Sequence, residues 1–175
     1  MQTNFLKNFY IYTENFHSDA TKYGIGTEPQ AKTRYMAVAK RFHKGLKSND
    51  CGLSILKDYP VIAASPDMEI TCNCICCEGG GLVEIKCPYS MRGDAPDEQL
   101  GYLKRHKDSK ALYLNRSHIY YTQIQGQMGV TGKKYCDFFV YTPHGHHLER
   151  IEFDSQFWEK TLKNLNYILV QPFGS

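Results

Sequence analysis

The amino-acid sequence predicts an α/β fold in which helices flank a mixed central β-sheet. Three observations lead to this prediction. The chain has 175 residues, which suits one domain with one sizeable hydrophobic core. Hydrophobic residues make up 42% and charged residues 22% of it, as in ordinary globular proteins. Segments with helix and strand patterns alternate along the chain, an order typical of a helix-covered sheet.

The first half of the chain contains one expected helix and two expected strands. Thr27 can cap the helix, Pro29 suits its first turn, and the apolar face that follows extends to about Lys44. Strands are expected over 59–64 and 81–87. The cysteine- and glycine-rich stretch between these strands is expected to form a hairpin connection.

The second half contains three expected helices and two expected strands. Gly132 is a natural stop for the second of these helices, and Asp154 is a natural cap for the last. A polar turn over 143–147 separates the two strands. In chain order, we expect helices over 97–106 and 117–131, strands over 135–142 and 148–153, and a helix over 154–169.

Charge and cysteine content limit the classes of partner and compartment. The formal net charge of +3 does not indicate a polyanion partner, so a nucleic-acid enzyme would have to concentrate its positive charge around a groove. No stretch approaches the ~20 apolar residues that cross a bilayer, so no membrane partner is expected. Residues 1–16 lack the features of a signal peptide. With an odd number of cysteines, this favours an intracellular, reducing compartment, cytoplasm or nucleus.

The expected strand over 81–87 carries the residues that point most clearly to chemistry. Residues two apart in a strand share a face, so Glu84 and Lys86 lie together while Ile85 points to the opposite, core side. Asp67 ends the preceding strand, where a hairpin can return it to Glu84. Converging carboxylates suit Mg²⁺, and a lysine beside the metal can orient or deprotonate an attacking water. The ordinary alternative is a Glu–Lys surface pair with Asp67 as a turn residue.

Four motifs occur in order along the chain and are similar to those of a known family. They are Tyr23-Gly24 with Glu28 and Ala31, Ser65-Pro66-Asp67, Glu84-Ile85-Lys86-Cys87-Pro88, and Tyr120 to Met128. Together they resemble the motifs of the YqaJ-type viral recombinase nucleases, relatives of phage lambda exonuclease within the PD-(D/E)XK superfamily. The resemblance covers roughly residues 23–165 and implies a restriction-endonuclease-like core.

The resemblance implies a divalent-metal exonuclease that digests duplex DNA from a free end, usually 5′ to 3′, in recombination or repair. Asp67 and Glu84 would bind Mg²⁺ or Mn²⁺, helped by the Ile85 carbonyl, and Lys86 would activate the water. The alternatives are a catalytically silent DNA-binding or interaction module on the same fold and an endonuclease of the same superfamily.

Two more residues acquire roles through the resemblance. Glu28, expected in the first turn of the first helix, would contribute through a second metal or its waters, and Gln123 would support the site from its helix. Gln127 lies four residues after Gln123, so both side chains share a helical face. The polar amides of Gln123 and Gln127 lie next to the apolar Ile124 and Met128, which suits an active-site wall better than a core.

The resemblance also bears on domain organisation and partners. We expect one nuclease domain over 1–175 with a core at about 23–169. The family's N-terminal segment, with its Ile-Thr-Ala-Ser-like motif, has no counterpart before Tyr23, so the chain is either a fragment or diverged there. Relatives form toroidal trimers, so a homo-oligomer is one candidate assembly. A single-strand annealing protein is a second candidate partner.

Two further groups of residues have both a structural and a functional interpretation. The cysteines of the connection are expected to be reduced thiols at a hairpin tip, and partial metal capture with Cys51 or a histidine is the alternative. The basic run over 104–110 is either a solvated helix face or a DNA contact. The cysteines in question are Cys72, Cys74, Cys76 and Cys77.

Overall fold

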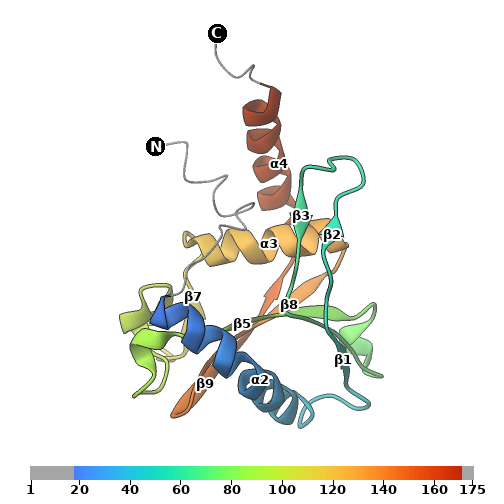
Figure 1. The fold of residues 1–175 in the computed structure, drawn as a ribbon. Coiled ribbons are helices and arrows are strands. Elements are labelled where there is room, and N and C mark those ends of the chain that lie inside the picture. Colours follow the sequence, from blue (N-terminus) through green and yellow to red (C-terminus); the bar gives the residue numbers. More distant parts are fainter. Residues whose placement is uncertain (1–17, 171–175) are drawn as a thin grey trace.

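The computed structural model describes residues 18–170, and a five-stranded mixed sheet forms their centre (Figure 1). Its strand order is β1-β4-β5-β8-β9, and β5 and β8 are the parallel neighbours in it. The α/β fold with a mixed sheet that the sequence predicts is therefore confirmed. The strands are β1 (Lys47–Asn49), β4 (Met68–Thr71), β5 (Gly81–Lys86), β8 (Tyr135–Thr142) and β9 (Gly145–Glu152).

Helices cover both faces of this sheet. Figure 1 shows α2 (Asp19–Ala39) and α3 (Ile119–Thr131) on opposite sides of β5 and β8, and α4 (Ser155–Val170) follows β9. Strand β5 alternates between the two cores: Val83 packs with Tyr35 of α2, and Leu82 packs with Ile124 of α3. Because residues two apart share a face, Glu84 lies on the α3 side with Leu82.

Short elements complete the fold. Two small hairpins lie outside the main sheet, and three single turns of 3₁₀ helix join the longer elements. The hairpins pair β2 (Ser54–Ile55) with β3 (Ala63–Ala64), and β6 (Leu103–Arg105) with β7 (Leu112–Leu114). The 3₁₀ turns are η1 (Ile75–Cys77), η2 (Tyr89–Met91) and η3 (Glu98–Leu100).

The first helix starts earlier and ends earlier than the sequence predicts. Ser18 is the actual N-cap, and its Oγ accepts a hydrogen bond of 3.1 Å from the Thr21 backbone N–H. Thr27 is buried within the helix, so the prediction that it caps the helix is wrong. Pro29 lies inside the helix on an exposed face, where its missing N–H removes one backbone hydrogen bond but does not end the helix. Glu28 therefore lies in the middle of α2 and not in its first turn.

The strand expected over 59–64 is also largely wrong. Residues around Pro60 form a turn, closed by a 2.8 Å bond from the Ile62 N–H to the Tyr59 carbonyl, and only Ala63–Ala64 is extended as β3. The strand that pairs with β5 in the antiparallel direction is β4, which lies in the stretch that was expected to be a connection. Asp67 thus immediately precedes a sheet strand.

The helix expected over 97–106 does not form. Only the single turn η3 is helical. Gly101 caps its C-terminal end, and the φ of 72° at Gly101 lies outside the right-handed helical region. Leu103 is then fully buried at the start of β6. Two later predictions are confirmed: Gly132 ends α3 with a φ of 69°, and Asp154 accepts a 2.9 Å bond from the Phe157 N–H at the start of α4. The turn expected over 143–147 is shorter than predicted, because β9 already begins at Gly145.

Candidate active site

Glu84 lies at the centre of a polar network between β5 and α3. Glu84 is only 2% exposed, yet both of its carboxylate oxygens accept hydrogen bonds. Lys86 Nζ lies 2.5 Å and Gln123 Nε2 2.8 Å from Oε1, while Gln127 Nε2 lies 2.8 Å from Oε2. A buried carboxylate is stabilised by such charge-assisted hydrogen bonds, which fix its orientation.

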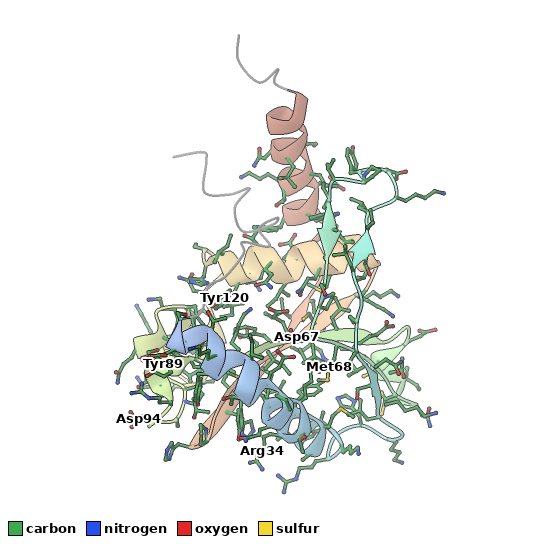
Figure 2. The ribbon with its side chains drawn as sticks, in the orientation of Figure 1. Arg34, Asp67, Met68, Tyr89, Asp94 and Tyr120 are labelled. Atoms are coloured by element: carbon green, nitrogen blue, oxygen red, sulfur yellow. The ribbon has the colours of Figure 1, made fainter. Side chains whose placement is uncertain are left out.

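Asp67 lies beside this network, directly before the neighbouring strand β4. Met68 pairs with Val83 in the antiparallel β4–β5 register, so Asp67, the next residue outward, lies beside Glu84. Its Oδ2 accepts a 2.6 Å hydrogen bond from the Ile85 backbone N–H. In Figure 2 the labelled Asp67 and Tyr120 lie in the region between α2 and α3.

The pKa of Asp67 is raised because the carboxylate is partly buried and lies near a second acid, Glu84. Burial and, secondly, the charge of Glu84 raise the pKa of Asp67 to about 7, and the Ile85 N–H and Lys86 only partly oppose this. The negative charge of Glu84 thus opposes the ionisation of Asp67, and a cation bound beside both carboxylates would offset this repulsion.

Lys86 is held between Glu84, Gln123 and an aromatic ring. Burial by itself lowers the pKa of Lys86, but the attraction and hydrogen bond of Glu84 outweigh it, so the pKa lies above its usual value. The Gln123 Oε1 accepts from Lys86 Nζ at 3.3 Å, and Nζ lies 4.4 Å from the centre of the Tyr120 ring. The lysine is charged in this arrangement.

Glu28 faces the same region from α2 but at a greater distance. Its carboxylate pairs with Lys32 at 3.1 Å, and Lys32 also contacts the exposed Asp50 at 2.9 Å. The charge of Glu28 contributes to the raised pKa of Asp67. After burial, it is also the largest cause that raises the pKa of the Cys87 thiol to about 11.

The three acids do not form a compact ligand group by themselves. Among residues 18–170, only His43, Cys72 and Cys74 are three potential metal ligands whose donor atoms all lie within 4.8 Å of one another. The structure thus brings Asp67, Glu84, Lys86 and Gln123 into one network, with Glu28 as an electrostatic neighbour outside it. Cys51, which the sequence offered as a further ligand, is not in that group of three potential ligands.

Gln127 is a site residue whose importance the sequence only hinted at. It is 4% exposed, and its amide fixes the second oxygen of Glu84. Gln125, on the same helix, points elsewhere: its Nε2 donates to the Glu152 carbonyl at 2.9 Å, and its Oε1 accepts from the Asp154 N–H at 2.8 Å. The spacing of four from Gln123 to Gln127 was the available signal.

A second buried carboxylate, Asp137, has a supporting role on the other face of the sheet. It receives two bonds from Arg150, at 2.8 and 3.1 Å, and one of 2.7 Å from the Tyr35 hydroxyl. Burial and the charge of Asp137 raise the pKa of Tyr35, so the hydroxyl stays a donor. This network ties α2 to β8 and β9 and thereby holds α2 against the sheet.

The basic run lies on a hairpin and not on a helix. Residues 104–110 are exposed on β6 and the turn to β7, and Arg105 pairs with Glu98 at 3.1 Å. Next to the hairpin, the Tyr102 ring contacts the Tyr120 ring with centroids 5.0 Å apart. Since Tyr120 also lies over Lys86, the hairpin adjoins the site.

Comparison with known proteins identifies a sequence family for this chain. The sequence profile of the YqaJ-like viral recombinase domain matches residues 3–134. That match begins upstream of Tyr23, in residues outside the described part of the structure, and ends before β8. No curated protein gives a significant match. None of the described helices is long and apolar enough to cross a membrane.

Two solved structures share the fold. An alkaline exonuclease (LHK-Exo) from Laribacter hongkongensis is 22% identical with a TM-score of 0.63, covering 88% of this chain and 69% of that chain. The structure of LHK-Exo in complex with dAMP is 23% identical with a TM-score of 0.65, covering 91% and 71%. At these identities the likeness concerns the fold.

Proposed function

Because the chain belongs to the YqaJ-like viral recombinase domain family, we propose that it is a divalent-metal-dependent DNA exonuclease. The observation that carries this proposal is the convergence of Asp67 and buried Glu84 beside Lys86 on β5. A carboxylate pair with an adjacent lysine supplies the ligands and the proton-handling group that metal-assisted phosphodiester hydrolysis needs. The substrate is duplex DNA with a free end, digested 5′ to 3′.

The residues present fit Mg²⁺ or Mn²⁺. Both ions prefer hard oxygen ligands, and Asp67 and Glu84 offer carboxylates whose mutual repulsion a cation would relieve. The N–H and C=O of a strand residue point to the same side, so the Ile85 carbonyl is directed toward Asp67 like the Ile85 N–H. Glu28 is close enough to act on Asp67 electrostatically and would contribute through a second ion or its waters.

The chain's own residues divide the remaining work. A bound divalent ion would polarise the scissile phosphate and lower the pKa of a coordinated water. Lys86 Nζ, which donates to Glu84 in this structure, would hold and orient that water if a cation shared the carboxylate. Gln123 and Gln127 keep Glu84 oriented throughout.

The surroundings of the site suit a DNA backbone. The exposed β6–β7 hairpin carries Lys104, Lys107 and Lys110, and Tyr102 at its base contacts Tyr120, so we propose this hairpin as a contact for the DNA backbone. LHK-Exo has been solved in complex with dAMP, a deoxynucleoside monophosphate, and we propose that this chain releases products of that class. A homo-oligomer and a single-strand annealing protein are the partners that we propose.

The direct test is digestion of end-labelled linear duplex DNA beside closed circular DNA. With Mg²⁺, the wild-type chain should release labelled mononucleotides from the linear DNA and leave the circle intact, while EDTA should stop the reaction. A Glu84→Gln protein is the matched inactive control. Linear DNA that stays intact with Mg²⁺ but binds the protein would indicate a silent module, and cutting of the circle would indicate an endonuclease.

A further inference from the structure

A cluster of soft ligands lies at the other end of α2 and the β4–β5 hairpin. His43 follows α2, Cys72 follows β4, Cys74 caps η1, and Cys77 ends η1 and precedes β5. The donor atoms of His43, Cys72 and Cys74 all lie within 4.8 Å of one another. His43 Nδ1 is 3.8 Å from Cys72 Sγ and 3.3 Å from the 2% exposed Cys77 Sγ.

The two distances from His43 suit neighbouring ligands of a tetrahedral zinc site, although Cys77 is not in the group of three whose donor atoms all lie within 4.8 Å of one another. Zn–S bonds of about 2.3 Å and Zn–N bonds of about 2.0–2.1 Å place neighbouring nitrogen and sulfur ligands roughly 3.5 Å apart. The two distances from His43 Nδ1 bracket that value. Cys74 and Cys77 are three residues apart in one turn, in which the Cys77 N–H donates to the Cys74 carbonyl at 3.0 Å.

Hydrogen-bond donors lie next to two of the sulfurs. The Lys44 backbone N–H donates to Cys74 Sγ at 3.3 Å, and Arg150 Nη1 lies 3.6 Å from Cys77 Sγ. A 2.9 Å bond from the Asn73 N–H to the Lys44 carbonyl holds the two loops together. Donors to coordinating sulfurs are the outer contacts that orient and stabilise metal thiolates.

We propose that His43 Nδ1 and the sulfurs of Cys72, Cys74 and Cys77 bind a structural Zn²⁺ ion. Four protein ligands leave no open coordination position, which distinguishes this site from the carboxylate site at Asp67 and Glu84. The ion would tie the end of α2 to the β4–β5 hairpin, the two units that carry Glu28 and the Asp67–Glu84 pair. The side chain of Cys76 lies outside the described part of the structure.

The test measures zinc directly and does not depend on nuclease activity. Protein purified under reducing conditions, without chelator, should contain about one zinc ion per chain by elemental analysis. X-ray absorption at the zinc edge should fit three sulfurs at about 2.3 Å and one nitrogen at about 2.0 Å. Removing the ion with a strong chelator, in the absence of Mg²⁺, should lower the unfolding temperature by about 5 °C or more.

Variants identify the ligands. His43→Ala and Cys74→Ser should each reduce the zinc content at least about fivefold, whereas Cys51→Ser, a free cysteine outside the cluster, should keep it. Wild-type protein that holds no zinc after incubation with the ion and desalting would overturn the proposal. So would an absorption spectrum with oxygen ligands only, which would place the ion at the carboxylates. The wild-type spectrum decides the question if the variants fail to fold.

Discussion

The carboxylate of Asp67 accepts a 2.6 Å hydrogen bond from the backbone N–H of Ile85, the residue between Glu84 and Lys86. This bond forms where the β4–β5 pairing ends, so it takes the place of the next bond in the ladder. It fixes the first acid of the site to the strand that carries the second acid and the lysine.

The raised pKa of Asp67 predicts an unusual pH dependence of stability. The pKa rises from its ordinary 3.8 to about 7 on folding, so the folded state binds more protons than the unfolded state between these values. The free energy of unfolding of the metal-free protein should therefore fall as the pH rises from about 4 to about 7. Glu84, Glu28 and Lys86 are the charged groups that act on this carboxylate.

Asp67→Asn tests that relationship because an asparagine oxygen can still accept the Ile85 hydrogen bond. In EDTA at pH 8 the variant should be more stable than the wild type, by on the order of 1–3 kcal/mol, and its profile should be flatter. Urea unfolding at pH 5 and pH 8 measures both effects, with the exposed Asp50→Asn as control. A variant less stable than the wild type at pH 8 would contradict the pKa assignment.

Lys86→Ala should separate the role of the lysine from that of the carboxylates. We expect cleavage to fall by about 10²–10⁴-fold, the usual contribution of a proton-handling group. Without metal, the buried Glu84 loses its cation partner, so the variant should be destabilised by ~1–3 kcal/mol. Mn²⁺ should restore stability but not activity. Near-normal cleavage with weakened Mn²⁺ binding, measured by calorimetry, would assign the lysine to the metal and not to the water.

Gln127→Leu should weaken the site by leaving one oxygen of Glu84 without its donor. An unsatisfied buried acceptor costs about 1–3 kcal/mol of stability, and the affinity for Mn²⁺ should fall because Glu84 is less well held. Gln125→Leu, on the same helix, is the matched control. It should lower stability because it removes the hydrogen bonds to the backbone of Glu152 and Asp154, yet it should leave Mn²⁺ affinity unchanged. Equal effects of the two variants on Mn²⁺ titrations would remove Gln127 from the site.

Glu28→Gln tests the more distant acid. It should raise metal-free stability slightly, because it removes negative charge that acts on Asp67, and it should reduce the cleavage rate by at least about tenfold. Asp50→Asn removes the other acid beside Lys32 and should leave the cleavage rate unchanged. If both variants cleave DNA at the wild-type rate, Glu28 is only a partner of Lys32.

The sequence predicted those features that local periodicity controls. The two-residue repeat of a strand correctly placed Glu84 and Lys86 on one face and Ile85 on the other. The start of α2 was misplaced because Ser18 supplies an earlier cap and because an exposed helix face tolerates Pro29. Local signals cannot distinguish an internal proline from one in the first turn.

Long-range relationships were beyond the sequence alone. The stretch over 97–106 had helical composition, but a positive φ at Gly101 and the burial of Leu103 against the sheet decided for a hairpin. The contact of His43 with Cys72 joins segments 29 positions apart and depends on where α2 ends. Spacing within the cysteine-rich stretch did not contain that information.

The measurement that tests the central claim most directly is anomalous X-ray scattering from crystals of the protein soaked in Mn²⁺. A peak should appear with carboxylate oxygens of both Asp67 and Glu84 within about 2.0–2.3 Å, and Lys86 Nζ should have moved away from Glu84. At saturating Mn²⁺, a site without a peak, with Lys86 still bound to Glu84, would contradict the proposed metal-dependent mechanism.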